Sequence, residues 1–419
     1  MKQDCEVRPD APARAGLWQT RVFVFLWCAI VISSSGTVLA LLALSIVAYE
    51  RTGSNLVASA VFASQWVAPV LAAPLLARFC ARVPFRWLLV TAESVSIPLT
   101  LGVGLAVPAV PAVAGALLFV RAFLDALSKS AVSIALKRSL PADLVAAGVA
   151  RCEGARLYGA ALGALLGTLV LGTFSLRQVI LLDALSFVVS LSCVLLARLP
   201  RRAVDARSAG ERGSALLMRG VSVLRADPAL GRFFLLLLAT TMPQAVHNIG
   251  RTALSVEHLG LDAAGVSALA MTTTLSLAVG AFLAAVLPGD WVRTAWGGTV
   301  LLLAPALFAV VSAVLPDVVP SFLSYALFVV VFEVGFVWFA AAFVAGCPVD
   351  AIEETAALRG AVLPGVLVVF VCLFGFVADV GGFLAGCLAY LALAAVLVPV
   401  QARMSGSKGV DHASDRVQR

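Results

Sequence analysis

Long apolar segments separated by short polar ones run through most of this chain. Twelve of them reach the length of roughly 20 residues that a helix needs to cross a bilayer. They lie near residues 20–49, 54–77, 87–107, 112–137, 145–172, 177–197, 232–256, 263–288, 294–315, 319–345, 355–378 and 381–401. The count falls to eleven or ten if neighbouring segments are merged, because only Asp379 and Val380 separate the last two.

The longest polar segment, residues 199–229, has six apolar segments before it and six after it. Between Ser214 and Arg225, apolar residues recur with helical spacing, which predicts an amphipathic helix at the membrane surface. We therefore expect an all-α membrane protein with twelve transmembrane helices in two six-helix halves. The expected parts are an N-terminal tail (1–19), a first half (20–198), the linker (199–229), a second half (230–402) and a C-terminal tail (403–419).

Composition agrees with this pattern, since 61% of the 419 residues are hydrophobic and only 13% are charged. Soluble domains have about half apolar and a quarter charged residues. Most of the 30 basic residues fall in the tails or in loops after even-numbered segments, whereas the opposite loops hold only Arg51 and Arg177. The positive-inside rule then predicts that both termini lie in the cytoplasm, and the expected location is the inner (plasma) membrane. The net charge of +7 is thus a topology signal, and we expect no nucleic-acid partner.

Signs of catalysis are absent from the sequence. It contains no HExxH, GxSxG or P-loop motif, and its eight cysteines form no CxxC pair. We therefore expect no enzyme activity, no cofactor, no metal site and no disulfide framework. A membrane-embedded sensor or enzyme is the remaining alternative outside transport, and it would need a nucleophile–base pair, metal ligands or a soluble domain.

Arg121, Asp125 and Lys129 lie four residues apart within one apolar segment, so they share a helical face. Each ionisable group near a bilayer centre costs at least about 2.5–3.5 kcal/mol on insertion scales, so this face must point at a polar pathway or cavity. Two plainer interpretations remain. Asp125 could only neutralise Arg121 or Lys129, and Lys129 could extend to the cytoplasmic surface.

Other segments add further polar candidates. His247 and Arg251 lie one turn apart in the seventh segment, where a substrate site and inter-helix packing are equally good explanations. Glu333, in the tenth, has no basic neighbour within a turn. A lone carboxyl in a membrane is a natural proton carrier, although a hydrogen-bonded structural role is the alternative. Asp125 and Glu333 are therefore the carboxyls predicted to couple transport to protons.

Three stretches resemble the major facilitator transporters. Residues 117–141 read LLFVRAFLDALSKSAVSIALKRSLP and residues 181–187 read LLDALSF, while residues 73–90 are similar to the basic loop between the second and third helices. In that loop Ala77 stands where the family has an aspartate. The pattern resembles the subgroup that holds the bacterial enterobactin exporter, macrolide efflux pumps and lysophospholipid transporters.

The resemblance implies that the first, fourth, seventh and tenth helices line a central cavity. Substrate-binding residues are then expected among Arg121, Lys129, His247, Arg251, Ser34 and Trp338. Arg121 also matches a family arginine linked to proton coupling. Conformational roles are expected for Arg78, Arg82, Glu93, Asp183, Gly159 and Gly163. The family's antiporters often have Gly-Pro in the fifth helix, where this chain has Gly159 followed by Ala160.

The expected function is that of a proton-coupled exporter working by alternating access. Arg121, Lys129 and Arg251 against Asp125 and Glu333 leave the expected cavity one positive charge in excess. This sign favours an anionic or zwitterionic amphipathic molecule, siderophore-like or drug-like. The alternative is a lipid flippase or importer of the same fold, for example for lysophospholipids. The expected partners are the small-molecule substrate, protons and membrane lipids, and we expect a monomer.

Overall fold

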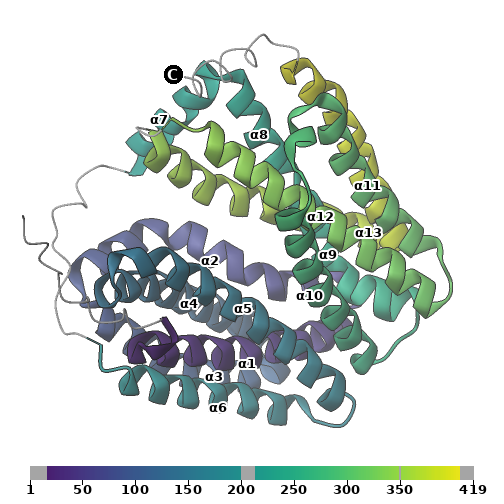
Figure 1. Ribbon diagram of the computed structural model, residues 1–419. Coiled ribbons are helices and arrows are strands. Elements are labelled where there is room, and N and C mark those ends of the chain that lie inside the picture. The colour runs from purple at the N-terminus through teal and green to yellow at the C-terminus, as the bar shows by residue number, and fades with distance from the viewer. Residues whose placement is uncertain (1–16, 200–212, 349–350, 406–419) are drawn as a thin grey trace, which may run out of the picture.

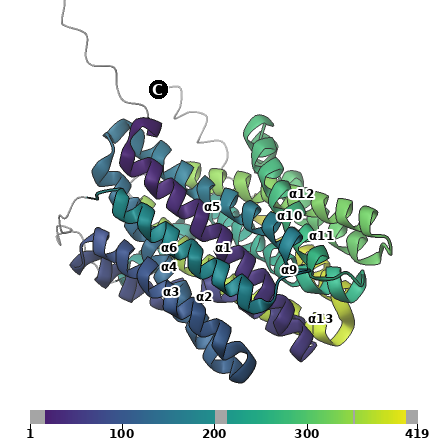
Figure 2. The same cartoon turned by 90° about the horizontal axis from the view of Figure 1, so that it is seen from below.

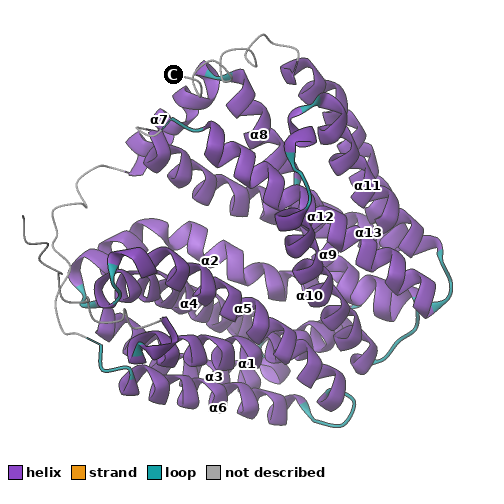
Figure 3. Cartoon of the chain, viewed as in Figure 1, coloured by secondary structure: helices purple, strands orange, loops and turns teal. Residues whose placement is uncertain are grey.

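The structure is a computed structural model that describes residues 17–199, 213–348 and 351–405. Throughout these ranges the chain is helical and forms no strand (Figure 3). A short 3-10 turn, η1 (Leu17–Gln19), precedes the first half. The six helices of that half are α1 (Arg21–Thr52), α2 (Asn55–Arg82), α3 (Phe85–Ala109), α4 (Pro111–Ser139), α5 (Ala142–Val170) and α6 (Leu176–Leu196).

The second half also contains six spans, but they do not correspond one to one with its helices. The seventh span consists of α8 (Pro228–Ala239), α9 (Thr241–Thr252) and a π-helical turn, η3 (Ala253–His258). The next elements are α10 (Ala263–Val286), the turn η4 (Asp290–Arg293), α11 (Ala295–Val314), α12 (Val318–Gly346) and α13 (Ile352–Ser405). The last two spans form α13, which is broken where Gly382 has a φ of 77°, a conformation that glycine adopts without strain.

The expected all-α membrane fold of twelve helices in two halves is therefore confirmed. By length and composition alone, eight helical segments of the described residues are suited to cross a membrane, and one of them contains both spans of α13. α4 is not among the eight, because Arg121, Asp125 and Lys129 interrupt its apolar sequence.

In the first half, α1 packs between α5 and α6, and α3 packs against α4 and α6 (Figure 2). Gly159 and Gly163 of α5 allow the close approach to α1. A Cβ at Gly159 would lie 2.6 Å from both the Val31 carbonyl oxygen and Ser34 Cβ. Small residues at this spacing let helices in a membrane pack through their backbones.

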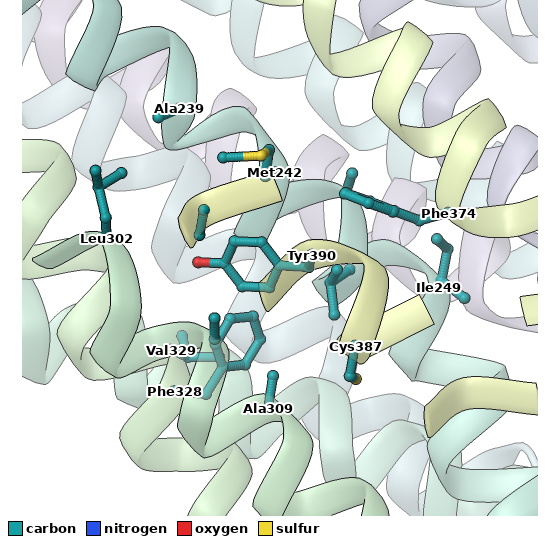
Figure 4. Close-up of a cluster of buried hydrophobic side chains, with 14 of the residues drawn as sticks. Ala239, Met242, Ile249, Leu302, Ala309, Phe328, Val329, Phe374, Cys387 and Tyr390 are labelled. Atoms are coloured by element: carbon teal, nitrogen blue, oxygen red, sulfur yellow. The ribbon is translucent and has the colours of Figure 1, made fainter. Parts of the chain in front are cut away.

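The second half has a core of large buried side chains, several of which are shown in Figure 4. Tyr390 of α13, Phe328 of α12 and Met242 of α9 all belong to it. At the edge of this half, Arg232 of α8 is only 3% exposed. Its guanidinium donates to Gln401 Oε1 at 3.1 and 3.0 Å and to the Thr294 carbonyl at 2.6 Å. These bonds tie the start of the second half to its end.

Helix α7 (Gly213–Ala226) lies where the amphipathic linker helix was expected. It packs on the second half, because a Cβ at its Gly220 would be 2.7 Å from the Glu354 carbonyl oxygen of α13. We call the end of the molecule where α6 ends and α8 begins the linker side, and the opposite end the far side. In Figure 1 the two halves meet near α9 and α10 and diverge toward α7 on the linker side.

Contacts on the far side join the halves. Asp379, beside the break in α13, accepts hydrogen bonds from Ser54 Oγ at 2.5 Å and from the Asn55 backbone N–H at 2.5 Å. It therefore caps the N-terminus of α2, a helix of the other half. The Asn55 side chain donates to Glu257 Oε2 at 2.8 Å and accepts from Thr252 Oγ1 at 3.2 Å. Among the described residues, all hydrogen bonds between the halves lie in this far-side cluster.

Candidate functional site: a charged cavity between the halves

A cavity of about 340 Å³ lies between the two halves. This volume is within the range of roughly 300–1,000 Å³ that is usual for small-molecule sites. Residues of α1 to α6 form its wall in the first half, and residues of α9 and α10 form it in the second. Its charged or titratable lining residues are Glu93, Arg121, Asp125, Lys129, Arg156, His247 and Arg251.

Arg121 is fixed by a partner from another helix. Its Nη1 lies 2.8 Å from Asp183 Oδ2 of α6, and its Nη2 donates to Thr37 Oγ1 of α1 at 2.7 Å. The guanidinium also lies 4.9 Å from the centre of the Phe187 ring. Of the two cations that Asp125 was expected to neutralise, Arg121 thus has a different close anion, the fully buried Asp183, whereas Lys129 does pair with Asp125.

Asp125 pairs instead with two other cations. Lys129 Nζ is 2.7 Å from Asp125 Oδ2, and Arg156 Nη1 of α5 is 3.9 Å from Oδ1. The Asp125 and Lys129 side chains are 47% and 41% exposed, and both line the cavity. Lys129 thus belongs to the cavity wall.

Two lining residues, Glu93 and Arg156, were not predicted as ligand-binding residues from the sequence. Arg156 was not among the candidates, although it lies midway along α5 and could have been recognised by its depth in the helix. Glu93 was assigned a conformational role. Its side chain is 7% exposed on the cavity wall of α3, and its Oε1 accepts a long bond of 3.5 Å from Ser128 Oγ.

His247 and Arg251 form a hydrogen-bonded chain with Tyr325 of α12. Arg251 Nη2 lies 3.0 Å from His247 Nε2, and His247 Nδ1 lies 2.9 Å from the Tyr325 hydroxyl. That hydroxyl also donates to the His247 carbonyl at 3.1 Å. The Arg251 side chain has only hydrogen-bond donors. This row of hydrogen bonds therefore fits a neutral His247 imidazole that accepts at Nε2 and donates from Nδ1.

Arg251 lacks the partner that Arg121 has. Its guanidinium lies 3.8 Å from the centre of the Phe62 ring on α2, which belongs to the first half. Among the described residues, its Nε and Nη1 have no hydrogen-bond acceptor, and it makes none of the ion pairs. The cavity wall therefore contains a guanidinium with two nitrogens, Nε and Nη1, that have no acceptor among the described residues.

The cavity does not include the residues predicted for it from α12. Glu333 faces α10, where a Cβ at Gly280 would be 2.7 Å from Glu333 Cβ. Trp338 donates from Nε1 to the Ala284 carbonyl at 2.9 Å. Within the described residues neither lines the cavity, and no residue of the tenth span does.

The remaining predicted residues are distributed between the wall and the surrounding packing. Ser34 lines the cavity, and Gly159 and Gly163 lie behind it against α1. Arg78 and Arg82 belong to the last turns of α2, and their side chains lie outside the described residues. The three-residue stripe of α4 lines the cavity as expected.

No protein-family model matches the sequence, and no curated protein matches it either. Solved structures of transporters do match its fold. A POT family transporter in complex with 5-aminolevulinic acid is 12% identical and superimposes with a TM-score of 0.72, covering 94% of this chain and 98% of that one. The nucleoside transporter NupG is 14% identical, with a TM-score of 0.70 and coverage of 92% and 100%.

A bacterial homologue of the human lysosomal transporter Spinster, in an inward-facing and unoccupied conformation, is also similar. It is 12% identical, with a TM-score of 0.65 and coverage of 91% of this chain and 97% of that one. At such identities the likeness extends to the fold alone. The chain is a multi-pass membrane protein with the major facilitator fold, whose two six-helix halves enclose a charged cavity.

Proposed function

We propose that this protein is a proton-coupled secondary active transporter that exports an anionic or zwitterionic amphipathic small molecule. The observation that carries the proposal is Arg251. A guanidinium that lines a cavity between two halves, with two nitrogens that have no acceptor among the described residues, is suited to bind a carboxylate or phosphate.

The charges of the whole cavity support the same sign of substrate. Its wall carries four basic side chains, Arg121, Lys129, Arg156 and Arg251, against two acidic ones, Glu93 and Asp125. Asp183, behind Arg121, adds a third acid. One positive charge remains, and in a partly dry cavity such an excess attracts anions and repels lipophilic cations.

The arrangement of the halves supports alternating access. In the described state the far side is closed by the cluster around Asp379 and Asn55, while the halves diverge on the linker side (Figure 1). Rocking of the halves about the cavity would open the far side and close the linker side. Arg251 and Phe62 come from different halves, so a ligand at Arg251 contacts the interface that rearranges.

The proposal is tested with three fluorescent probes that share a dansyl group and differ in charge. These are the anion N-dansyl-6-aminohexanoate, the zwitterion Nε-dansyl-lysine and the cation dansylcadaverine. The purified protein is reconstituted in vesicles, and probe movement is measured with and without an imposed pH gradient. We expect transport of the anion or the zwitterion, stimulation by the gradient, and loss of that stimulation with a protonophore.

Arg251→Gln provides the residue-level test, and Arg177→Gln, an exposed arginine at the start of α6, is its matched control. Losing a charge-assisted hydrogen bond costs about 1.5–3 kcal/mol, so apparent affinity should fall roughly 10- to 150-fold in Arg251→Gln only. Transport of the cation in preference to both other probes would contradict the substrate class. Transport that a protonophore leaves unchanged would contradict the proton coupling.

A further inference from the structure

Glu93 is the carboxylate of the cavity wall that has no cation of its own. Among the described residues it takes part in no ion pair, and its Oε2 has no hydrogen-bond partner. Its Oε1 accepts a long bond of 3.5 Å from Ser128 Oγ, and the Ser190 hydroxyl of α6 lies near the same carboxyl group. The side chain is nevertheless 7% exposed, so bulk water does not replace these partners.

The other two acids near the cavity are held by bases. Asp183 lies 2.8 Å from Arg121, and Asp125 lies 2.7 Å from Lys129 and 3.9 Å from Arg156. The titratable groups that face Glu93 are Asp125 of α4, Arg156 of α5 and Cys193 of α6, with Cys28 of α1 beside Cys193. Arg156 is not a dedicated partner of Glu93, because its Nη1 already lies 3.9 Å from Asp125 Oδ1.

A buried carboxylate without a neighbouring cation is unstable in a medium of low dielectric. Its negative charge is neutralised when it binds a proton or a cationic group. We propose that Glu93 is the proton-binding residue of this transporter, and that the cationic group of a zwitterionic substrate displaces the proton from it. The inference rests on the proposed function, in which Arg251 binds the anionic group of the same substrate.

The charges give the direction of coupling. With Glu93 ionised, Arg121, Lys129 and Arg156 are balanced by Glu93, Asp125 and Asp183, so that Arg251 alone is in excess. Protonation of Glu93 adds one positive charge. A simple anion then binds better together with the proton, whereas a zwitterion competes with the proton through its cationic group. Exchange of substrate for protons is therefore expected for zwitterions and not for simple anions.

Infrared spectroscopy tests the proton site without any substrate. Difference spectra between low and high pH are recorded on the reconstituted protein, in the carbonyl region of protonated carboxyl groups. Glu93→Gln should remove one component of the band. Glu333→Gln, whose carboxyl lies outside the cavity, should keep that component, and Glu93→Asp should retain it at a shifted frequency. Persistence of every component in Glu93→Gln would overturn the assignment.

Probe binding tests the coupling. In the wild type, affinity for Nε-dansyl-lysine should fall by up to about tenfold for each unit by which the pH decreases, because proton and ammonium compete. Affinity for N-dansyl-6-aminohexanoate should not fall. Glu93→Gln should abolish the pH dependence for the zwitterion, which also separates Glu93 from any titration of His247.

The two proposals fail differently. If no dansyl probe binds the wild type, the proposed function loses its support, and the infrared measurement still decides the proton site. If the probes bind and the zwitterion keeps its pH dependence in Glu93→Gln, the inference about Glu93 is wrong and the proposed function stands.

Discussion

The ion pair between Arg121 and Asp183 provides the sharpest test of how the first half is held together. The two side chains are 6% and 0% exposed, and their charged atoms are 2.8 Å apart. Removing one partner leaves the other charge buried and uncompensated, which typically costs about 3–5 kcal/mol. Replacing both by apolar side chains removes both charges and costs much less. We therefore expect Arg121→Met and Asp183→Leu each to be strongly destabilising and the double variant to be milder than either.

Buried thiols supply the assay. Cys152 of α5 is 2% exposed, so a thiol-reactive dye gains fluorescence as heating unfolds the first half. One kcal/mol shifts a midpoint by roughly 2–4 °C in a domain of this size, so each single variant should lose about 6–20 °C. Cys387 of α13, which is fully buried, reports on the second half in the same way, and each of the two thiols is read in a variant whose other cysteines are replaced. If the double variant loses the sum of the two single losses, the side chains are not coupled and the reasoning is refuted.

Two further predictions concern the helix contacts. Gly159→Ala should lower the midpoint by an amount equivalent to about 1–3 kcal/mol, because its methyl group meets α1 at 2.6 Å, whereas Gly115→Ala, with open space around it, should not. An equal effect of the two changes would contradict the close packing of α1 and α5. Asp379→Ala removes the cap of α2, and loss of a cap costs about 0.5–2 kcal/mol, so the far-side-open population should rise roughly 2- to 30-fold. Labelling of Phe62→Cys by a thiol reagent applied from the far side measures this rise. The control is Asp317→Ala, since Asp317 makes no side-chain cap, and unchanged labelling in Asp379→Ala would show that Asp379 does not hold the far side closed.

The fold follows from the sequence to a large degree. Twelve apolar segments, a polar linker after the sixth and an amphipathic stretch at Ser214–Arg225 correspond to the helices of the structure. The break between the last two spans was less evident, because they form one helical run interrupted only at Gly382. The length and hydrophobicity of a segment predict a membrane-spanning helix directly. In a bilayer every backbone N–H and C=O group must find its hydrogen-bond partner within the helix.

The site was predictable only in part. The four-residue spacing of Arg121, Asp125 and Lys129 correctly placed them on one face, but spacing within a helix does not reveal partners on other helices. Asp183 lies two helices after Arg121 in the sequence, and only tertiary packing brings the two together. Glu333 shows the converse difficulty, that a helix's rotation is not given by its sequence position. Its position in the tenth span was compatible with the cavity, but the rotation of α12 turns the side chain toward Gly280.

Alternating access of the two halves is the central claim, and a pair of spin-label distances tests it most directly. One pair spans the far side, at the exposed positions Glu50 and Val380, and the other spans the linker side, at Trp87 and Trp296. Pulsed electron paramagnetic resonance would record both distances in lipid, with and without Nε-dansyl-lysine and at low and high pH. The account predicts two populations that change in opposite directions, the far-side distance lengthening as the linker-side distance shortens. A single unchanging distribution at both pairs under every condition would contradict it.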